Sequence, residues 1–121
     1  MKVFSFEKLE VWQESTKLVK QIYNITNSFP QEEKFGLTSQ MRRSSISIAS
    51  NLAEGTSRKT ARDKAHFSTI AFSSAMELLN QLIISKELNF VTEESYILLR
   101  KKLEKITNML NALRNYQLKD K

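Results

Sequence analysis

The sequence predicts an all-α protein: an antiparallel, up-down-up-down four-helix bundle formed by a single domain over residues 1–121. Three observations support this fold class. The length suits one ordinary domain. Two glycines and one proline leave few helix breakers. Apolar residues recur at spacings of three and four along four long segments, and four helices with short connections pack as an antiparallel bundle.

The first helix is expected over about residues 5–27, with Ser5 as its N-cap. Two apolar stripes run along it, so it should contact more than one neighbouring helix. Trp12 and Tyr23 lie on the first stripe, and we expect both rings to be core residues rather than ligand-stacking ones. The stripes comprise Leu9, Trp12, Thr16, Val19, Tyr23 and Thr26, and Val11, Leu18, Ile22 and Ile25.

The second helix, about residues 38–54, carries no charge from Ser44 to Ala53, and its many serines would allow neighbouring helices to approach closely. Glu54 falls in the last turn, where the helix dipole disfavours an acid, and Gly55 is a natural terminating residue. An acid at this position indicates a fixed partner, with a solvated carboxylate as the alternative. The candidate partners are Arg58, Arg42 or a backbone amide from another helix.

The third helix is expected over about residues 61–88, after the capping signal Thr60-x-x-Asp63. Between Phe67 and Ser85 its only charged residue is Glu77, and apolar residues cover two of its sides. A helix of this kind is surrounded by protein or lipid, and its polar residues make lipid the weaker interpretation. Because one small bundle covers one face well, we expect a second subunit to cover the other and predict a homo-oligomer.

The fourth helix is expected over about residues 92–117, with Thr92 as its N-cap. Its apolar residues form one narrow seam with charged residues around it, so one face should be buried and the rest solvated. The tail after Tyr116 has nothing to bury and is expected to fray. The seam is Tyr96, Leu99, Leu103, Ile106, Leu110 and Leu113.

Three polar residues are expected to be buried and structural: Glu54, Glu77 and Asn51. A lone carboxylate inside an apolar helix must find a cation or donors, or else be protonated. We therefore expect Glu77 to pair with Arg42 or Arg43, within or between subunits. This structural role is favoured over a catalytic one.

The net charge of +6 arises from 19 basic and 13 acidic side chains, and it is concentrated in the second half of the chain. Such a field favours nucleic acid, an acidic protein or an anionic membrane as partner. The basic residues cluster at opposite ends of the second helix and in the loop after it, where a solvated turn is the alternative. The candidate nucleic-acid-binding residues are Arg42, Arg43, Arg58, Lys59, Arg62 and Lys64.

No catalytic, metal or cofactor site is expected. The chain has no cysteine, and His66, its one histidine, gives a single Asp63-x-x-His66 where a di-iron bundle needs paired Glu-x-x-His motifs. Gly-rich phosphate loops and serine elbows are absent too. We expect a non-enzymatic protein with no small-molecule substrate and no membrane role. Without a secretory signal at residues 1–10, a cytoplasmic location is expected.

Three segments carry a family resemblance, and together they span about residues 4–113. QMRRSSISIASNLAEG resembles the central motif of the bacterial 23S rRNA intervening-sequence proteins. FEKLEVWQESTKLVKQIYNITNSFPQEEKFGL is similar to their first helix and connecting turn, and FSTIAFSSAMELLNQL extends the likeness. The resemblance implies antiparallel four-helix bundles assembled into cyclic oligomers, commonly pentamers. The family name records where many of the genes lie rather than an activity.

A related group, the accessory proteins of diversity-generating retroelements, forms basic barrels that engage nucleic acid and a reverse transcriptase. By analogy this favours an oligomeric bundle that binds RNA, DNA or a nucleoprotein through its basic residues. The alternative function is a structural or protein-interaction scaffold, whose charge serves solubility or an acidic partner. Salt-dependent binding distinguishes the two.

Overall fold

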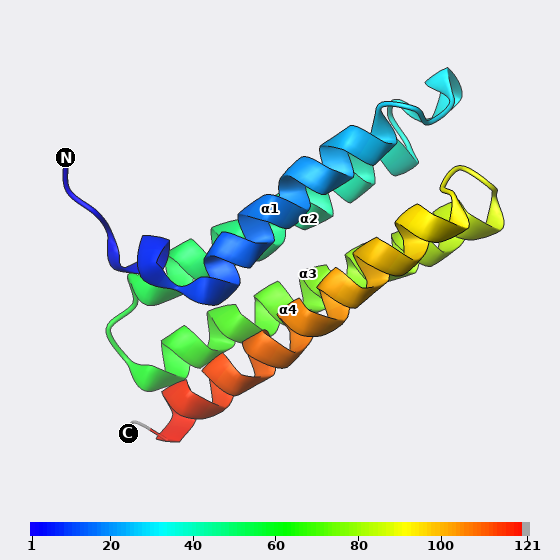
Figure 1. The fold of residues 1–121 in the computed structure, drawn as a ribbon. Coiled ribbons are helices and arrows are strands. Elements are labelled where there is room, and N and C mark those ends of the chain that lie inside the picture. Colours follow the sequence, from blue (N-terminus) through cyan, green and yellow to red (C-terminus); the bar gives the residue numbers. More distant parts are fainter. Residues whose placement is uncertain (120–121) are drawn as a thin grey trace.

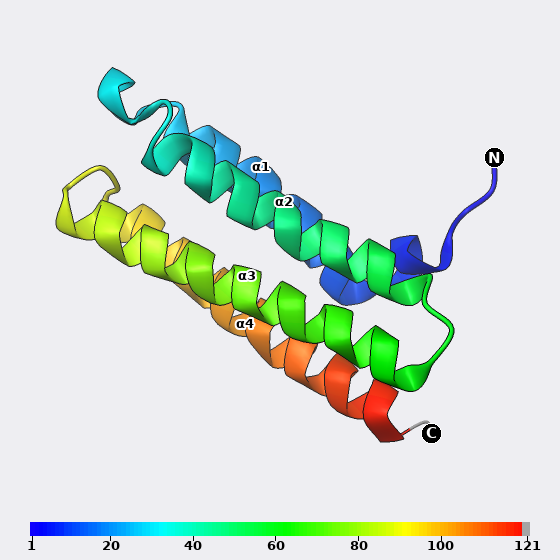
Figure 2. The same ribbon diagram turned by 180° about the vertical axis from the view of Figure 1, so that it is seen from behind.

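The computed structural model describes residues 1–119 and is all-α (Figure 1). Its four long helices are α1 (Glu10–Thr26), α2 (Leu37–Thr56), α3 (Ala61–Glu87) and α4 (Glu93–Lys119). Each helix packs on the next and α4 returns to α1, as in an up-down-up-down bundle. Both views show α1 beside α2 and α3 beside α4, with the N-terminus, the α2–α3 turn and the end of α4 at one end (Figures 1 and 2).

The expected helix boundaries hold to within a few residues, except at the start of the first helix. Residues Ser5–Lys8 form a short 3₁₀ helix, η1, and α1 begins only after an extended Leu9. The Ser5 N-cap prediction is therefore wrong. The Glu7 carboxylate instead accepts a hydrogen bond from the backbone amide of Phe4 at 2.8 Å. A second 3₁₀ helix, η2 (Gln31–Glu33), occupies the connection before α2.

The capping predictions for the later helices are confirmed. Thr60 accepts a hydrogen bond from the Asp63 amide, and Thr92 accepts one from the Ser95 amide, each at 3.1 Å. The expected fraying after Tyr116 is wrong as far as Lys119, because α4 continues to that residue and Gln117 is buried. The rest of that tail, residues 120–121, lies outside the described residues.

The core runs along the axis where the four helices meet, and most of the predicted seams line it. On α3 and α4 the expected residues are buried, among them Leu78, Leu82 and Leu103. On α1 the second stripe, with Leu18 and Ile22, forms the core instead of the first. Trp12 packs partly buried against this core, as predicted. Tyr23 does not, because its side chain is 37% exposed.

The closest contact between α2 and α3 depends on small residues. Gly55 was expected to terminate α2. Instead it lies buried within the helix. A Cβ added there would come within 2.8 Å of the Cβ of Phe67 on α3. Further along, the hydroxyls of Ser47 and Ser74 lie 2.8 Å apart, and Ser44 donates to Gln81 at 3.1 Å. The thin helix surface predicted for α2 thus brings two backbones together and satisfies the polar groups between them.

Helix α3 is the one helix within residues 1–119 long and apolar enough by composition to cross a membrane. Core helices of soluble proteins share this property, and α3 packs here against both α2 and α4. Only 39% of its most apolar window is buried within the chain. Its outward side carries Met76 and Ile84, exposed at 38% and 40%. The single chain therefore leaves part of its most apolar helix uncovered.

The seam between α1 and α4 is the least extensive, and a charged cluster bridges it. Glu14 on α1 is 8% exposed, and its carboxylate lies 2.7 Å from Lys102 and 3.5 Å from Lys105, both on α4. Lys17, one turn along α1, lies 3.3 Å from the same carboxylate. The hydrogen bonds from Lys102 and Lys17 lower the pKa of Glu14 to about 2, although burial opposes that shift.

We expect Glu14→Gln to lower the free energy of unfolding at pH 7 by about 1 to 3 kcal/mol, because charged hydrogen bonds to three lysines are weakened. The pKa of Glu14 in the folded protein lies below its ordinary value of 4.5, so this stabilisation is complete above about pH 4.5 and is lost as the pH falls toward 2. Thermal unfolding from pH 7 to pH 2 should therefore show the gap between wild type and variant closing. A gap that stays constant with pH would contradict the assignment.

Gly55→Ala should also destabilise the protein. The new methyl group meets the fixed Cβ of Phe67, so α2 and α3 must separate. Overpacking outweighs the gain in helix propensity, for a net loss of about 1 to 2 kcal/mol in chemical denaturation. Ser50→Ala, at an exposed position of the same helix, is the matched control and should change little. Equal stability of Gly55→Ala and wild type would show that the close approach carries no constraint.

Candidate functional site

The six predicted basic residues fall into two groups at opposite ends of α2, as the sequence indicated. In the first group, Arg42 is held by the end of α1. Its Nε donates to the Thr26 hydroxyl at 2.9 Å, and one terminal nitrogen donates to the Asn27 side-chain oxygen at 3.0 Å. Its guanidinium also stacks 4.4 Å from the Tyr23 ring centre. Arg42 therefore joins α1 to α2, whereas Arg43 beside it is exposed.

The second group surrounds the α2–α3 turn. Arg58 lies 3.2 Å from Glu54 and 4.5 Å from the ring centre of Phe67. Glu54 thus has one of its expected partners, but its side chain is 54% exposed, so its predicted burial is wrong. Lys59 and Arg62 are exposed, and neither has a hydrogen bond or ion pair to any of residues 1–119. These two side chains are the available cations of this group.

Charge is distributed unequally between the two ends of the bundle. The end that holds both termini and the α2–α3 turn, here called the basic end, comprises residues 1–13, 51–68 and 107–119. It carries eight lysine and arginine residues and four acids. The opposite end, residues 24–43 and 80–97, carries four basic residues and five acids. One of those four, Lys86, is paired with Glu93 at 2.6 Å.

The sequence interpretation missed a third group of cations, midway along α1 and α4. Lys17 on α1 and Lys102 and Lys105 on α4 surround Glu14, and Lys20 and Lys101 are exposed on the same two helices. On α4 these lysines had been assigned only to the solvated surface. The signal was their number, because three lysines around one shared acid leave a net positive charge.

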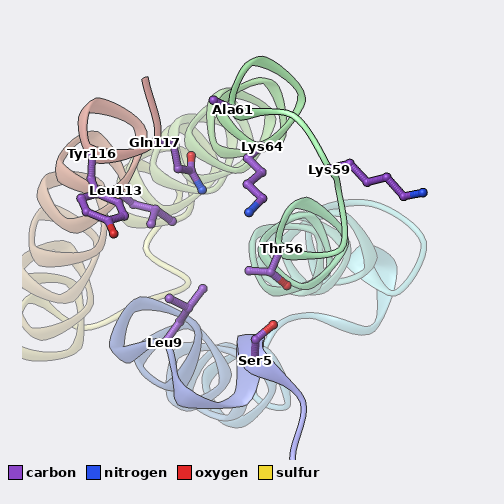
Figure 3. A pocket seen from close by; sticks show the side chains of 9 residues that line it. All are labelled: Ser5, Leu9, Thr56, Lys59, Ala61, Lys64, Leu113, Tyr116 and Gln117. Carbon is purple, nitrogen blue, oxygen red and sulfur yellow. The ribbon is translucent and has the colours of Figure 1, made fainter. Parts of the chain in front are cut away.

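A cavity of about 330 Å³ lies at the basic end, between η1 and the ends of α2, α3 and α4 (Figure 3). Leu9 and Leu113 form its apolar part. The ammonium group of Lys64 points into it, whereas Lys59 points away to the outside (Figure 3). Of the four basic residues predicted near this turn, Lys64 is therefore the one directed inward.

The remaining predicted polar residues have simpler roles in the chain. Asn51 is partly buried, and its side-chain amide donates to the Ser47 carbonyl at 2.9 Å. Glu77 is exposed and makes no ion pair within residues 1–119, so its predicted burial and its pairing with Arg42 or Arg43 are wrong for the single chain. Its helix turns it to the outward side of α3. Residues 1–119 contain no cluster of three or more histidine, cysteine or acidic side chains suited to a metal ion.

Comparison with known protein families shows which family the chain belongs to. The model of the family described as 23S rRNA-intervening sequence protein matches residues 7–112. The chain belongs to this family. The match includes all six predicted basic residues and the lysines around Glu14, whereas Ser5, Leu113, Tyr116 and Gln117 of the cavity lie outside the matched range. No curated protein matches the chain.

A solved structure supports the fold of this family member. It is a protein of unknown function from the S23 ribosomal protein family of Bacteroides thetaiotaomicron, 21% identical to this chain. The likeness has a TM-score of 0.77 and covers 86% of this chain and 97% of the other. At that identity it shows the fold alone. Neither comparison supports the expected relation to retroelement accessory proteins.

Proposed function

We propose that this protein is a non-enzymatic, oligomeric bundle that binds nucleic acid through the phosphate backbone. The observation that supports this proposal most strongly is the charge of the basic end, which has eight basic and four acidic residues, with Lys59 and Arg62 exposed. Cations without protein partners are the ones that can release counterions from phosphates. The lysines of α1 and α4 extend the same positive field along the molecule. RNA and DNA both satisfy this chemistry.

Self-association is the second part of the proposal. The outward sides of α2 and α3 carry Ile46, Met76 and Ile84, each about two-fifths exposed, together with small serines. Arg43 and Glu77 are the exposed charges nearest to them. The outward sides of α1 and α4 carry the lysines. An apolar α2–α3 face that joins copies would leave the basic α1–α4 face outside. Repeated weak phosphate contacts then add by avidity. A ring, with five copies implied by the resemblance, gives this arrangement.

One observation favours the alternative, a protein-interaction scaffold. At the end opposite the basic end, Phe35 is 86% exposed beside the partly exposed Ile46 and Tyr23. Exposed apolar side chains of this kind mark protein contacts. The acids at this end make it a poor phosphate surface. Binding to nucleic acid that does not weaken with salt, or is absent at low salt, would favour the scaffold.

Lys59→Ala/Arg62→Ala should weaken nucleic-acid binding about tenfold in a mobility shift at about 50 mM salt, because two phosphate contacts are lost. The slope of log affinity against log salt should fall by about 2. The matched control is Lys34→Ala/Arg43→Ala, which removes the same charge at the opposite end and should have a smaller effect. Equal losses in both variants would show that net charge alone matters, and absent binding would remove the nucleic-acid role.

The variant Ile84→Lys tests self-association, because it places a charge on the α3 side of the proposed apolar interface. Sedimentation velocity at micromolar concentration should show an oligomer for wild type and smaller species for this variant. Leu98→Lys on α4, where the native leucine is 58% exposed, is the matched control and should leave the oligomer intact. A monomeric wild type, or dissociation caused by the control alone, would contradict the assignment of the interface to α2 and α3.

A further inference from the structure

The cavity at the basic end has the size of a small-ligand site. Its volume of about 330 Å³ lies at the lower end of the range for such sites, about 300 to 1,000 Å³. Three chain segments that are distant in sequence contribute its walls (Figure 3). Tyr116 at its edge is 67% exposed, so the cavity can be reached from solvent. The side chains of its walls therefore determine which ligand the cavity can bind.

The polar part of the wall includes an ammonium group and a side-chain amide, besides the hydroxyls of Ser5, Thr56 and Tyr116. The Lys64 ammonium group points into the cavity and has no hydrogen bond or ion pair to residues 1–119 (Figure 3). Gln117 is 8% exposed, and its side-chain oxygen accepts from the Ser68 hydroxyl at 2.7 Å. That contact occupies the oxygen and turns the amide nitrogen toward the cavity (Figure 3). A buried amide donor and an ammonium group thus converge on one space.

The cavity walls contain no carboxylate among the described residues. The hydroxyl of Thr56 is already used, since it donates to the Ala53 carbonyl at 2.9 Å. An ammonium group and an amide N–H that share a confined space favour an acceptor that carries negative charge. The excess of basic residues at this end adds to the same preference. The polar wall is therefore suited to an anion.

The apolar part of the wall determines the chemistry of the uncharged part of the ligand. Leu9, just before α1, lies across the cavity from Lys64 and Gln117, and Leu113 lies beside Gln117 on α4 (Figure 3). We propose that the cavity binds a small organic carboxylate, with its charged group at Lys64 and Gln117 and an aliphatic or aromatic body against Leu9 and Leu113. One cation matches a monoanion better than it matches a phosphate dianion. This site goes beyond nucleic-acid binding, because a duplex backbone cannot enter the cavity.

The proposal also explains the different directions of two neighbouring lysines. Lys59 and Lys64 both line the cavity region, but Lys59 points outward and Lys64 inward (Figure 3). The outward lysine is available to a polymer that passes over the turn. The inward lysine is available to a molecule small enough to enter. The two proposed activities therefore depend on different side chains.

The experiment measures thermal unfolding and calorimetric binding with sodium phenylacetate, sodium hexanoate and phenyl phosphate, against sodium chloride at equal ionic strength. For wild type, a carboxylate at ten times its Kd should raise Tm by about 4 to 8 °C. Lys64→Met should lower the affinity at least tenfold. Lys59→Met, the matched control, should retain it. Gln117→Glu places an acid in the cavity and should abolish carboxylate binding, which provides a second variant should Lys64→Met fold poorly.

A two-dimensional ¹H–¹⁵N spectrum locates the site, because the side-chain amide signals of Gln117 should shift with phenylacetate and not with chloride. Absence of a carboxylate effect on wild type would overturn the proposal, as would equal binding by Lys64→Met and wild type. Tighter binding of phenyl phosphate than of phenylacetate would overturn the carboxylate assignment. These results are independent of nucleic-acid binding, which is tested through Lys59 and Arg62.

Discussion

The close approach of α2 to α3 is the constraint on which the rest of the molecule depends. Gly55 lies against Phe67, Ser47 meets Ser74, and Ser44 donates to Gln81, so the two backbones come nearer than larger residues on α2 would allow. Polar contacts between these serines cost little burial energy because each hydroxyl has a partner. The pair forms a central unit, and α1 and α4 are added to it from one side.

This arrangement places apolar and charged side chains on different parts of the bundle surface. Midway along, the central pair carries mostly small and apolar residues, with Glu77 as the one charge between Phe67 and Ser85 of α3. Its other charged residues lie near the ends of α2 and α3, and basic residues exceed acids at the basic end. Within that end, neighbouring side chains do different work: Arg58 is paired with Glu54, Lys59 is free at the surface, and Lys64 enters the cavity.

Periodicity predicted four helices, their order and the core residues of α3 and α4, because those seams follow one spacing over many turns. On α1 the expected contact with more than one helix is confirmed, but the spacing did not show that Leu18 and Ile22 of the second stripe would be fully buried while Tyr23 of the first stays exposed. Glu14 was missed because its partners are 88 and 91 residues away. Gly55 was misread as a terminator because the crowding by Phe67 is tertiary. Among the site residues, sequence located the two basic groups and the Arg58–Glu54 pair, but not the contacts that hold Arg42 against the end of α1.

The α1–α4 seam depends on charge more than the other three do. Those seams are mostly apolar or hydrogen-bonded, with the Arg42 guanidinium between α1 and α2 and one ion pair, Lys86–Glu93, between α3 and α4. A carboxylate shared by three lysines holds the α1–α4 seam, and such attraction weakens as mobile ions screen it. The ion cluster that joins α1 to α4 is therefore sensitive to the salt concentration of the solution. In concentrated electrolyte the two helical hairpins would loosen along this line first, while each remained intact.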